Sequence, residues 1–169
     1  QAWADVFADS DARGGGPAVV PCFAIHRAQE LWFDLHRVLR HTAAGAPDAA
    51  GRPRWLSMDA PLAARMTEVY AELLTRRNEQ GEQSPWRNPA LAERLGLADE
   101  AAVDRYLVDL WARVGRNRAP GGTLRAMHDP ELSRVVALAG SGMCEGGRIV
   151  DFITDQIGNP AATIVLCGY

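Results

Sequence analysis

The sequence predicts an α/β fold of three layers, in which a mostly parallel, Rossmann-like sheet carries helices on both faces. Short apolar runs bounded by glycine or proline, typical of buried strands, alternate with longer segments whose apolar residues recur at helical spacing. Four such strands separated by helices imply βαβ units, and right-handed crossovers between parallel strands distribute the helices over both faces. A length of 169 residues suits a single domain that can bury a substantial core.

The first half of the chain is expected to form two strands and three helices. Pro21 cannot donate to a strand ladder, so it should lie at the end of the first strand or at a bulge. Asp59 and Pro61 supply a cap and a first-turn proline for the third helix. The predicted elements are a helix near Ala2–Asp11, a strand at Ala18–Phe23, a helix from His26 to about His41, a strand at Arg54–Met58 and a helix from Leu62 to Arg77.

The second half begins with a polar loop at Gln80–Pro89 and then resumes the alternation of helix and strand. The run Val135–Ala139 is wholly apolar and bounded by glycine, which is typical of a fully buried parallel strand. The other predicted elements are a short helix at Ala90–Leu95, a helix from about Asp99 to Val114, a helix that starts at Arg148 and a last strand at Ala162–Cys167.

A glycine-rich turn, Gly140–Gly147, connects the buried strand to the helix that starts at Arg148. A turn of this kind lets the backbone N–H groups at a helix start face an anion. It also lies where open α/β sheets bind ligands, beyond the carboxyl ends of the strands. We expect Gly142 to occupy a positive-φ conformation, so that valine there would disrupt the turn. Ser141 has neither a nucleophile-elbow pattern around it nor an identifiable base, which argues against a nucleophile.

The composition is that of a soluble globular protein, with 47% hydrophobic and 23% charged residues. The net charge of −3 gives no overall attraction to nucleic acid, so binding of nucleic acid would require a local basic patch. Cys22, Cys144 and Cys167 are odd in number and lie in or beside apolar runs, which indicates reduced thiols in a cytoplasmic protein. No signal peptide or membrane-length apolar run is visible.

Three polar turns follow strands of the predicted sheet: Pro21–Glu30, Asp59–Ala63 and Gly140–Met143. Taken singly, each has a plain structural explanation, since Asp59 can cap its helix, Arg27 and Gln29 can be solvated, and the glycines can satisfy backbone geometry. In a parallel sheet, however, all three turns lie at one edge. Their convergence favours a binding crevice there.

These segments resemble the β-CASP domain of RNA-processing nucleases of the metallo-β-lactamase fold. The ordered matches cover nearly the whole chain from Gly15 onward, with Ala60 in place of a serine. The motifs are "PxFAxxRxQE" (Pro21, Phe23, Ala24, Arg27, Gln29, Glu30), "DSPLA…T…Y" (Asp59, Pro61, Leu62, Ala63, Thr67, Tyr70), "SGMxxGGR" (Ser141 to Arg148) and "P…T…GY" (Asn159-Pro160 to Gly168-Tyr169).

The resemblance implies a domain, residues 1–169, that is excised from or inserted in a larger protein. In such nucleases the metallo-β-lactamase-fold part holds two zinc ions, and a metal-bound hydroxide attacks the phosphodiester. The His-x-His-x-Asp-His segment that binds these ions has no counterpart here, so we expect no catalytic residue, no metal ligand and no cleavage by this polypeptide alone. The expected partners are RNA and the parent's zinc domain, with no membrane, and homo-oligomerisation stays open.

On this resemblance the RNA- or phosphate-binding residues are His26, Arg27, Asp59, Ser141, Gly142, Met143 and Arg148. His26 stands where family members commonly have glycine, and Asp151 and Phe152 replace histidines that several members carry, which leaves the RNA contacts and the mode of cleavage open. We expect His36 and His41 to be solvated and His128 to lie in a loop. A second basic group could follow a phosphate backbone or merely solubilise a helix end: Arg113, Arg116, Arg118 and Arg125.

Two other functions are consistent with parts of the sequence. A nucleotide-binding Rossmann-like enzyme would use Gly140, Gly142 and Gly146, but their spacing misses GxGxxG. A non-catalytic scaffold of the same family would have lost the zinc ligands of its parent. The parent sequence decides among these, because an intact His-x-His-x-Asp-His segment upstream favours the nuclease.

Overall fold

The computed structural model describes residues 2–116 and 121–167, which form a four-stranded sheet in the order β2-β3-β1-β4. The strands are β1 (Ala18–Pro21), β2 (Trp55–Asp59), β3 (Val135–Ala139) and β4 (Thr163–Ile164). Every neighbouring pair is parallel, so the α/β fold with a parallel sheet is confirmed.

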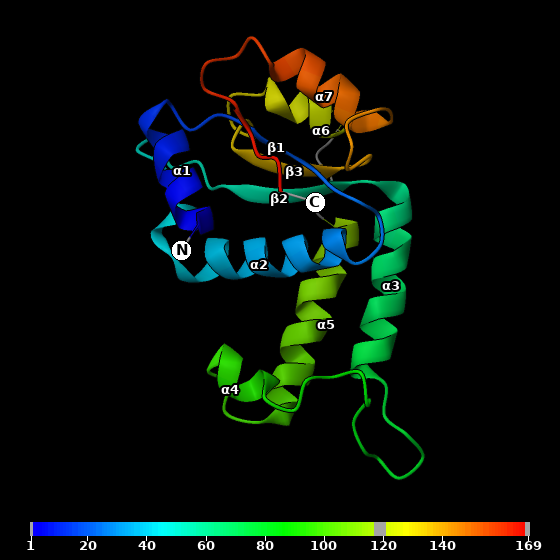
Figure 1. Ribbon diagram of the computed structural model, residues 1–169. Helices are drawn as coiled ribbons and strands as arrows, with labels where there is room; N and C mark the ends of the chain where they lie inside the picture. Colours follow the sequence, from blue (N-terminus) through cyan, green and yellow to red (C-terminus); the bar gives the residue numbers. More distant parts are fainter. Residues whose placement is uncertain (1, 117–120, 168–169) are drawn as a thin grey trace.

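Helices cover both faces of the sheet, which gives the molecule three layers (Figure 1). The connection from β1 to β2 runs through α2 on one face, and the connection from β3 to β4 runs through α7 on the opposite face. Right-handed crossovers require this arrangement, because the two connections run in opposite directions along the sheet. The helices are α1 (Ala2–Ala12), α2 (Arg27–His41), the 3-10 turn η1 (Ala43–Gly45), α3 (Pro61–Thr75), α4 (Leu91–Leu95), α5 (Glu100–Arg116), α6 (Thr123–Met127) and α7 (Arg148–Gln156).

The predicted boundaries hold to within a few residues, apart from short elements. The strand β1 ends at Pro21 rather than Phe23, which places the proline at the strand end as expected. The last strand shrinks to Thr163–Ile164. Neither η1, of three residues, nor α6, of five, was predicted from the sequence.

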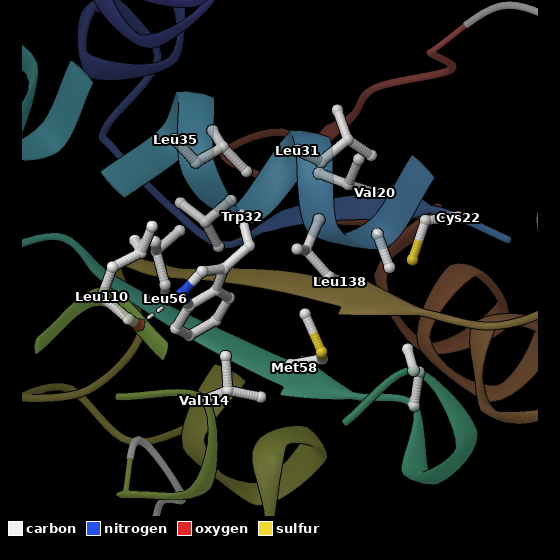
Figure 2. Close-up of a cluster of buried hydrophobic side chains, with 14 of the residues drawn as sticks. Val20, Cys22, Leu31, Trp32, Leu35, Leu56, Met58, Leu110, Val114 and Leu138 are labelled. Atoms are coloured by element: carbon white, nitrogen blue, oxygen red, sulfur yellow. Dashed lines mark hydrogen bonds between the residues drawn. The ribbon is translucent and has the colours of Figure 1, made fainter. Parts of the chain in front are cut away.

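The larger hydrophobic core lies between the sheet and α2, α3 and α5. Figure 2 shows Trp32 of α2 lying among Leu56, Leu110 and Val114, with its indole nitrogen bonded to the Leu110 carbonyl oxygen at 3.0 Å. Trp32 is fully buried. Alternate residues of the strands face the other way and pack beneath α6 and α7. This second core contains Val19, Met127, Val135, Ala137, Ala139, Ile149 and Phe152.

The helices α3 and α5 extend away from the sheet side by side and carry α4 at their far end (Figure 1). The expectation for His36 on α2 is wrong, because this residue is buried and packs edge-on against Tyr106 of α5. His128 closes α6 and bonds to Asp155 of α7 at 2.8 Å. No helix within the described residues is long and apolar enough to cross a lipid bilayer.

Candidate functional site

The three predicted turns converge at the carboxyl edge of the sheet. In the strand register Ala139, the last residue of β3, lies level with Pro21 on one side and Asp59 on the other. The chain leaves the sheet at the same height from all three strands, and the prediction that these turns share one edge is confirmed. The turn after β3 occupies the middle, because β3 lies between β2 and β1.

The adjacent strands β1 and β3 send their connections to opposite faces of the sheet. Open α/β sheets have their ligand crevice at such a point, outside the carboxyl ends of the strands. Phe23 and Gly142 meet here, and a β-carbon built on Gly142 would lie 2.9 Å from the phenyl ring. Phe23 is nevertheless 47% exposed and Met143 is 45% exposed, so this edge of the sheet presents apolar surface to a ligand.

The glycine-rich turn is closed by its own hydrogen bonds. Ser141 N–H donates to the Gly146 carbonyl oxygen at 3.1 Å, and Ile149 N–H donates to the Gly140 carbonyl oxygen at 3.0 Å. The Ser141 hydroxyl accepts a hydrogen bond from Met143 N–H at 3.3 Å, so this hydroxyl helps to stabilise the turn. Within the described part of the chain, no acceptor is found for the N–H groups of Gly142, Glu145, Gly146 and Gly147, which are available to an anion.

The conformational expectation for Gly142 is wrong. Its φ is not positive, and the left-handed positions of this turn are Gly147 with φ of 72° and Cys144 with φ of 57°. Gly142 is required for another reason, since any side chain there would collide with Phe23. A β-carbon at Gly147 would lie 2.7 Å from the Gly140 carbonyl oxygen, so Gly147 is constrained both by conformation and by space.

Asp59 does not cap α3, which is a correction to the sequence prediction. The capping position is Ala60, and no side chain bonds to the helix start there. Asp59 is the last residue of β2, and its side chain lies on the face of the sheet covered by α6 and α7. It pairs instead with Arg148, the first residue of α7, at 2.7 Å. The turn after β2 is thereby joined to the turn after β3.

His26 and Arg27 lie at the start of α2, on the other flank of the glycine-rich turn. Nδ1 of His26 is 2.8 Å from the Tyr70 hydroxyl of α3, and Nε2 is 3.6 Å from the Glu30 carboxylate. Arg27 contacts the same carboxylate at 3.4 Å. Since each guanidinium group carries five N–H donors, this single contact leaves Arg27 free to bind another anion.

Gln29 corrects the expectation of a solvated side chain. It is buried, and its amide nitrogen lies 3.2 Å from the carbonyl oxygens of Ala24 and Ala63 and 3.1 Å from the Thr67 hydroxyl. This amide ties the turn after β1 to α3. The position of the His26 turn at the carboxyl edge therefore depends on a buried hydrogen-bond cluster.

All seven predicted residues lie at the carboxyl edge. Ser141, Gly142 and Met143 belong to the glycine-rich turn, and the other four form one group on each side of it. Asp59 and Arg148 form the group on the β2 side, and His26 and Arg27 form the group on the β1 side. Sequence reasoning missed Phe23 and Tyr70, although both lie inside the quoted motifs. Their exposure and contacts are tertiary properties that no spacing shows.

The second basic group is only partly described. Arg113 is paired with Asp109 on its own helix, with Nη2 and Oδ2 3.0 Å apart, which agrees with the solubilising explanation. Arg118 and the side chain of Arg116 lie outside the described residues, as do Gly168 and Tyr169 of the last motif. Arg125 is exposed on the short helix α6.

Comparison with known proteins agrees with this geometry. The family model described as the Beta-Casp domain matches residues 28–169, which is most of the chain. The chain belongs to the Beta-Casp family. It is also 29% identical over 157 residues to Ribonuclease TTHA0252 of Thermus thermophilus, an alignment that covers 92% of this chain and 30% of the relative. The chain thus spans less than a third of that relative's length.

The backbone at His26 has a conformation that suits glycine. His26 has φ of 69° and ψ of −63°, in a region that residues with a β-carbon rarely enter. The histidine therefore occupies a position that suits glycine, and its bond to Tyr70 is a local compensation.

The described residues of this Beta-Casp domain do not gather a set of metal-binding side chains. No group of three or more His, Cys, Asp or Glu side chains within the described residues could hold one. We therefore assign no metal ligand and no metal-dependent step to these residues.

Proposed function

We propose that this domain binds RNA along the carboxyl edge of its sheet and holds it for cleavage in the intact protein, a ribonuclease. Two findings support the proposal: membership of the Beta-Casp family, and likeness to a protein named a ribonuclease. Because the chain spans only 30% of that relative, cleavage is proposed for the whole protein.

The convergence of the three turns is the observation on which the proposal depends. It brings together the unpartnered N–H groups of the glycine-rich turn and the half-exposed guanidinium groups of Arg27 and Arg148, whose side chains are 45% and 57% exposed. Backbone N–H groups and arginine forks are the donors that proteins use to hold phosphate oxygens. The exposed ring of Phe23 adds a surface on which an unpaired base can stack.

The chemical step lies elsewhere in this proposal. Zinc ions would be held by a metallo-β-lactamase-fold domain of the intact protein, and the residues described here would bind and orient RNA without transferring a proton. Binding at this edge and hydrolysis are therefore separable, and a family member that binds without cutting would be a scaffold.

The test uses the intact protein and a short single-stranded RNA. We expect Arg27→Ala and Arg148→Ala each to weaken binding about tenfold and to reduce the salt dependence of log K by roughly one. Arg76→Ala is the matched control, because this exposed arginine lies at the end of α3 remote from the sheet and should leave affinity unchanged.

Wild-type affinity in both edge variants would refute the proposal. Retained binding without any hydrolysis by the wild-type protein would support the RNA site and identify the protein as a scaffold.

A further inference from the structure

Asp59 is a largely buried carboxylate with few partners. Its side chain is 13% exposed, and the ion pair with Arg148 is the single contact that the described residues give it. A carboxylate has about four acceptor positions, so most of those on Asp59 have no donor among the described residues. These acceptor positions are therefore available to a donor that comes from outside this domain.

A hollow of about 240 Å³ lies beside this carboxylate. It opens at the carboxyl edge and is lined by Ser57, Asp59, Pro61, Gly122, Thr123 and Arg148. Pockets that hold drug-sized ligands measure roughly 300–1,000 Å³, so this hollow suits a smaller fragment such as one pentose. The Ser57 and Thr123 hydroxyls bond to each other at 2.8 Å. Asp59 and Arg148 are the charged residues of the lining that can meet a ligand.

The position of Asp59 in the sheet indicates which fragment binds. Asp59 ends β2, and the glycine-rich turn follows the neighbouring strand β3 at the same height. In dinucleotide-binding sheets an acidic residue near a glycine-rich turn accepts hydrogen bonds from ribose hydroxyls, while the phosphate lies against the turn and the helix that follows it. Here the acidic residue is Asp59 at the end of β2, and the glycine-rich turn follows the adjacent strand β3.

We propose that Asp59 accepts a hydrogen bond from the 2′-hydroxyl group of one nucleotide, whose phosphate is held by Arg148 and the glycine-rich turn. The inference rests on the proposed function and adds a means of distinguishing RNA from DNA at one position of the bound strand. The ion pair with Arg148 is part of the arrangement, because a free carboxylate would repel the adjacent phosphate.

The experiment is a scan of single 2′ substitutions in a short single-stranded RNA, with binding measured on the intact protein. Each oligonucleotide carries one 2′-deoxy or one 2′-fluoro nucleotide, and fluorine keeps an RNA-like sugar while removing the donor. We expect one position at which both substitutions weaken binding to the wild-type protein by about tenfold. In the Asp59→Ala variant, 2′ substitution at this position should no longer change the binding affinity.

Arg148→Ala is the matched variant, and it should weaken binding to every oligonucleotide while retaining the penalty at that one position. Each variant is compared with itself across the series, so a reduced folded fraction lowers all affinities together and leaves the pattern intact. A guanosine-to-inosine series tests the alternative donor, the exocyclic amine of a base.

Three results would overturn the inference: a wild-type protein indifferent to 2′ substitution at every position, a penalty that persists in Asp59→Ala, or a loss that follows the base amine instead of the sugar. The first two leave the proposed function standing if RNA still binds through Arg148. Failure of the unmodified RNA to bind would overturn both.

Discussion

The phenyl ring of Phe23 lies so close to Gly142 that a β-carbon built on this glycine would be 2.9 Å from two ring atoms, Cδ2 and Cε2. The contact joins the turn after β1 to the turn after β3, at the point where the two connections part to opposite faces. The glycine thus sets where an exposed aromatic side chain can lie at the carboxyl edge of the sheet.

Gly142→Ala should displace the Phe23 ring and destabilise the domain by about 1–2 kcal/mol, because overpacking forces neighbouring side chains to move. Gly146→Ala is the control in the same turn, since a β-carbon there meets no atom within 4 Å. Melting temperatures of the two variants of the intact protein measure the difference. Adding Phe23→Ala to Gly142→Ala should recover part of the loss, and strictly additive effects of the two substitutions would show that the contact is unimportant.

Gly142 also illustrates how far sequence reasoning reaches. The strand–turn–helix order around Val135–Ala139 was predictable from apolar runs and glycine, and the shared edge followed from the rule for parallel strands. The prediction that the turn needs glycine was correct, but the positive φ predicted for Gly142 was wrong, because this position needs glycine for steric reasons. A steric demand from Phe23, more than a hundred residues away in sequence, leaves no local signal.

The pairing of Asp59 with Arg148 was unpredictable for a similar reason. The sequence places a carboxylate before a proline at a helix start, and this local pattern favours a cap. In the fold, β2 ends one residue later than expected and turns Asp59 toward the face covered by α7. Which face a strand residue meets depends on the register and on the neighbouring helix, and these are tertiary properties.

Asp11 forms ion pairs with two buried arginines that precede β2 and β3, at the amino ends of these strands. Removal of its carboxylate should destabilise the domain. Its carboxylate lies 2.7 Å from Arg54 and 2.8 Å from Arg134, whose side chains are 1% and 3% exposed. Burial alone would raise the pKa of Asp11, but hydrogen bonds from both arginines outweigh it and hold the pKa below the ordinary value of 3.8.

Asp11→Ala should therefore cost about 2 kcal/mol, less than a fully buried pair because the Asp11 side chain is 41% exposed and water replaces part of the interaction. The control is Asp9→Ala, whose 72% exposed carboxylate pairs with Arg13 on the surface and should change stability by no more than about 0.5 kcal/mol. Denaturant unfolding compares the two variants, and equal midpoints would contradict the assigned role of Asp11.

His36 should make the domain less stable in mild acid. Burial, reinforced by the nearby Arg113 and Arg40 and opposed by Asp109, lowers the pKa of His36 from 6.5 to about 4. Between these two pH values the unfolded chain takes up a proton that the folded protein excludes, so stability falls as the pH is lowered from 6.5 toward 4. The loss should be on the order of 2 kcal/mol.

The measurement for His36 is the exchange protection of the α2 amides, corrected for the intrinsic exchange rate at each pH. His36→Gln should flatten the dependence between pH 6.5 and 4.5 that the wild-type protein shows, because glutamine does not titrate. His41→Gln is the control on the same helix, since His41 is exposed. An equal slope in wild type and His36→Gln would assign the acid sensitivity to other groups.

The left-handed backbone at His26 predicts an unusual order of stability for the glycine and alanine variants at this position. His26→Ala loses the bond to Tyr70 and keeps the strain of φ at 69°, whereas His26→Gly loses the same bond and relieves the strain. The glycine variant should therefore be the more stable of the two by about 1 kcal/mol, the reverse of the order in a helix or strand. Tyr70→Phe removes the bond alone and reports its separate contribution. Melting temperatures of the intact protein decide the order, and an alanine variant as stable as the glycine variant would show that the turn relaxes at no cost.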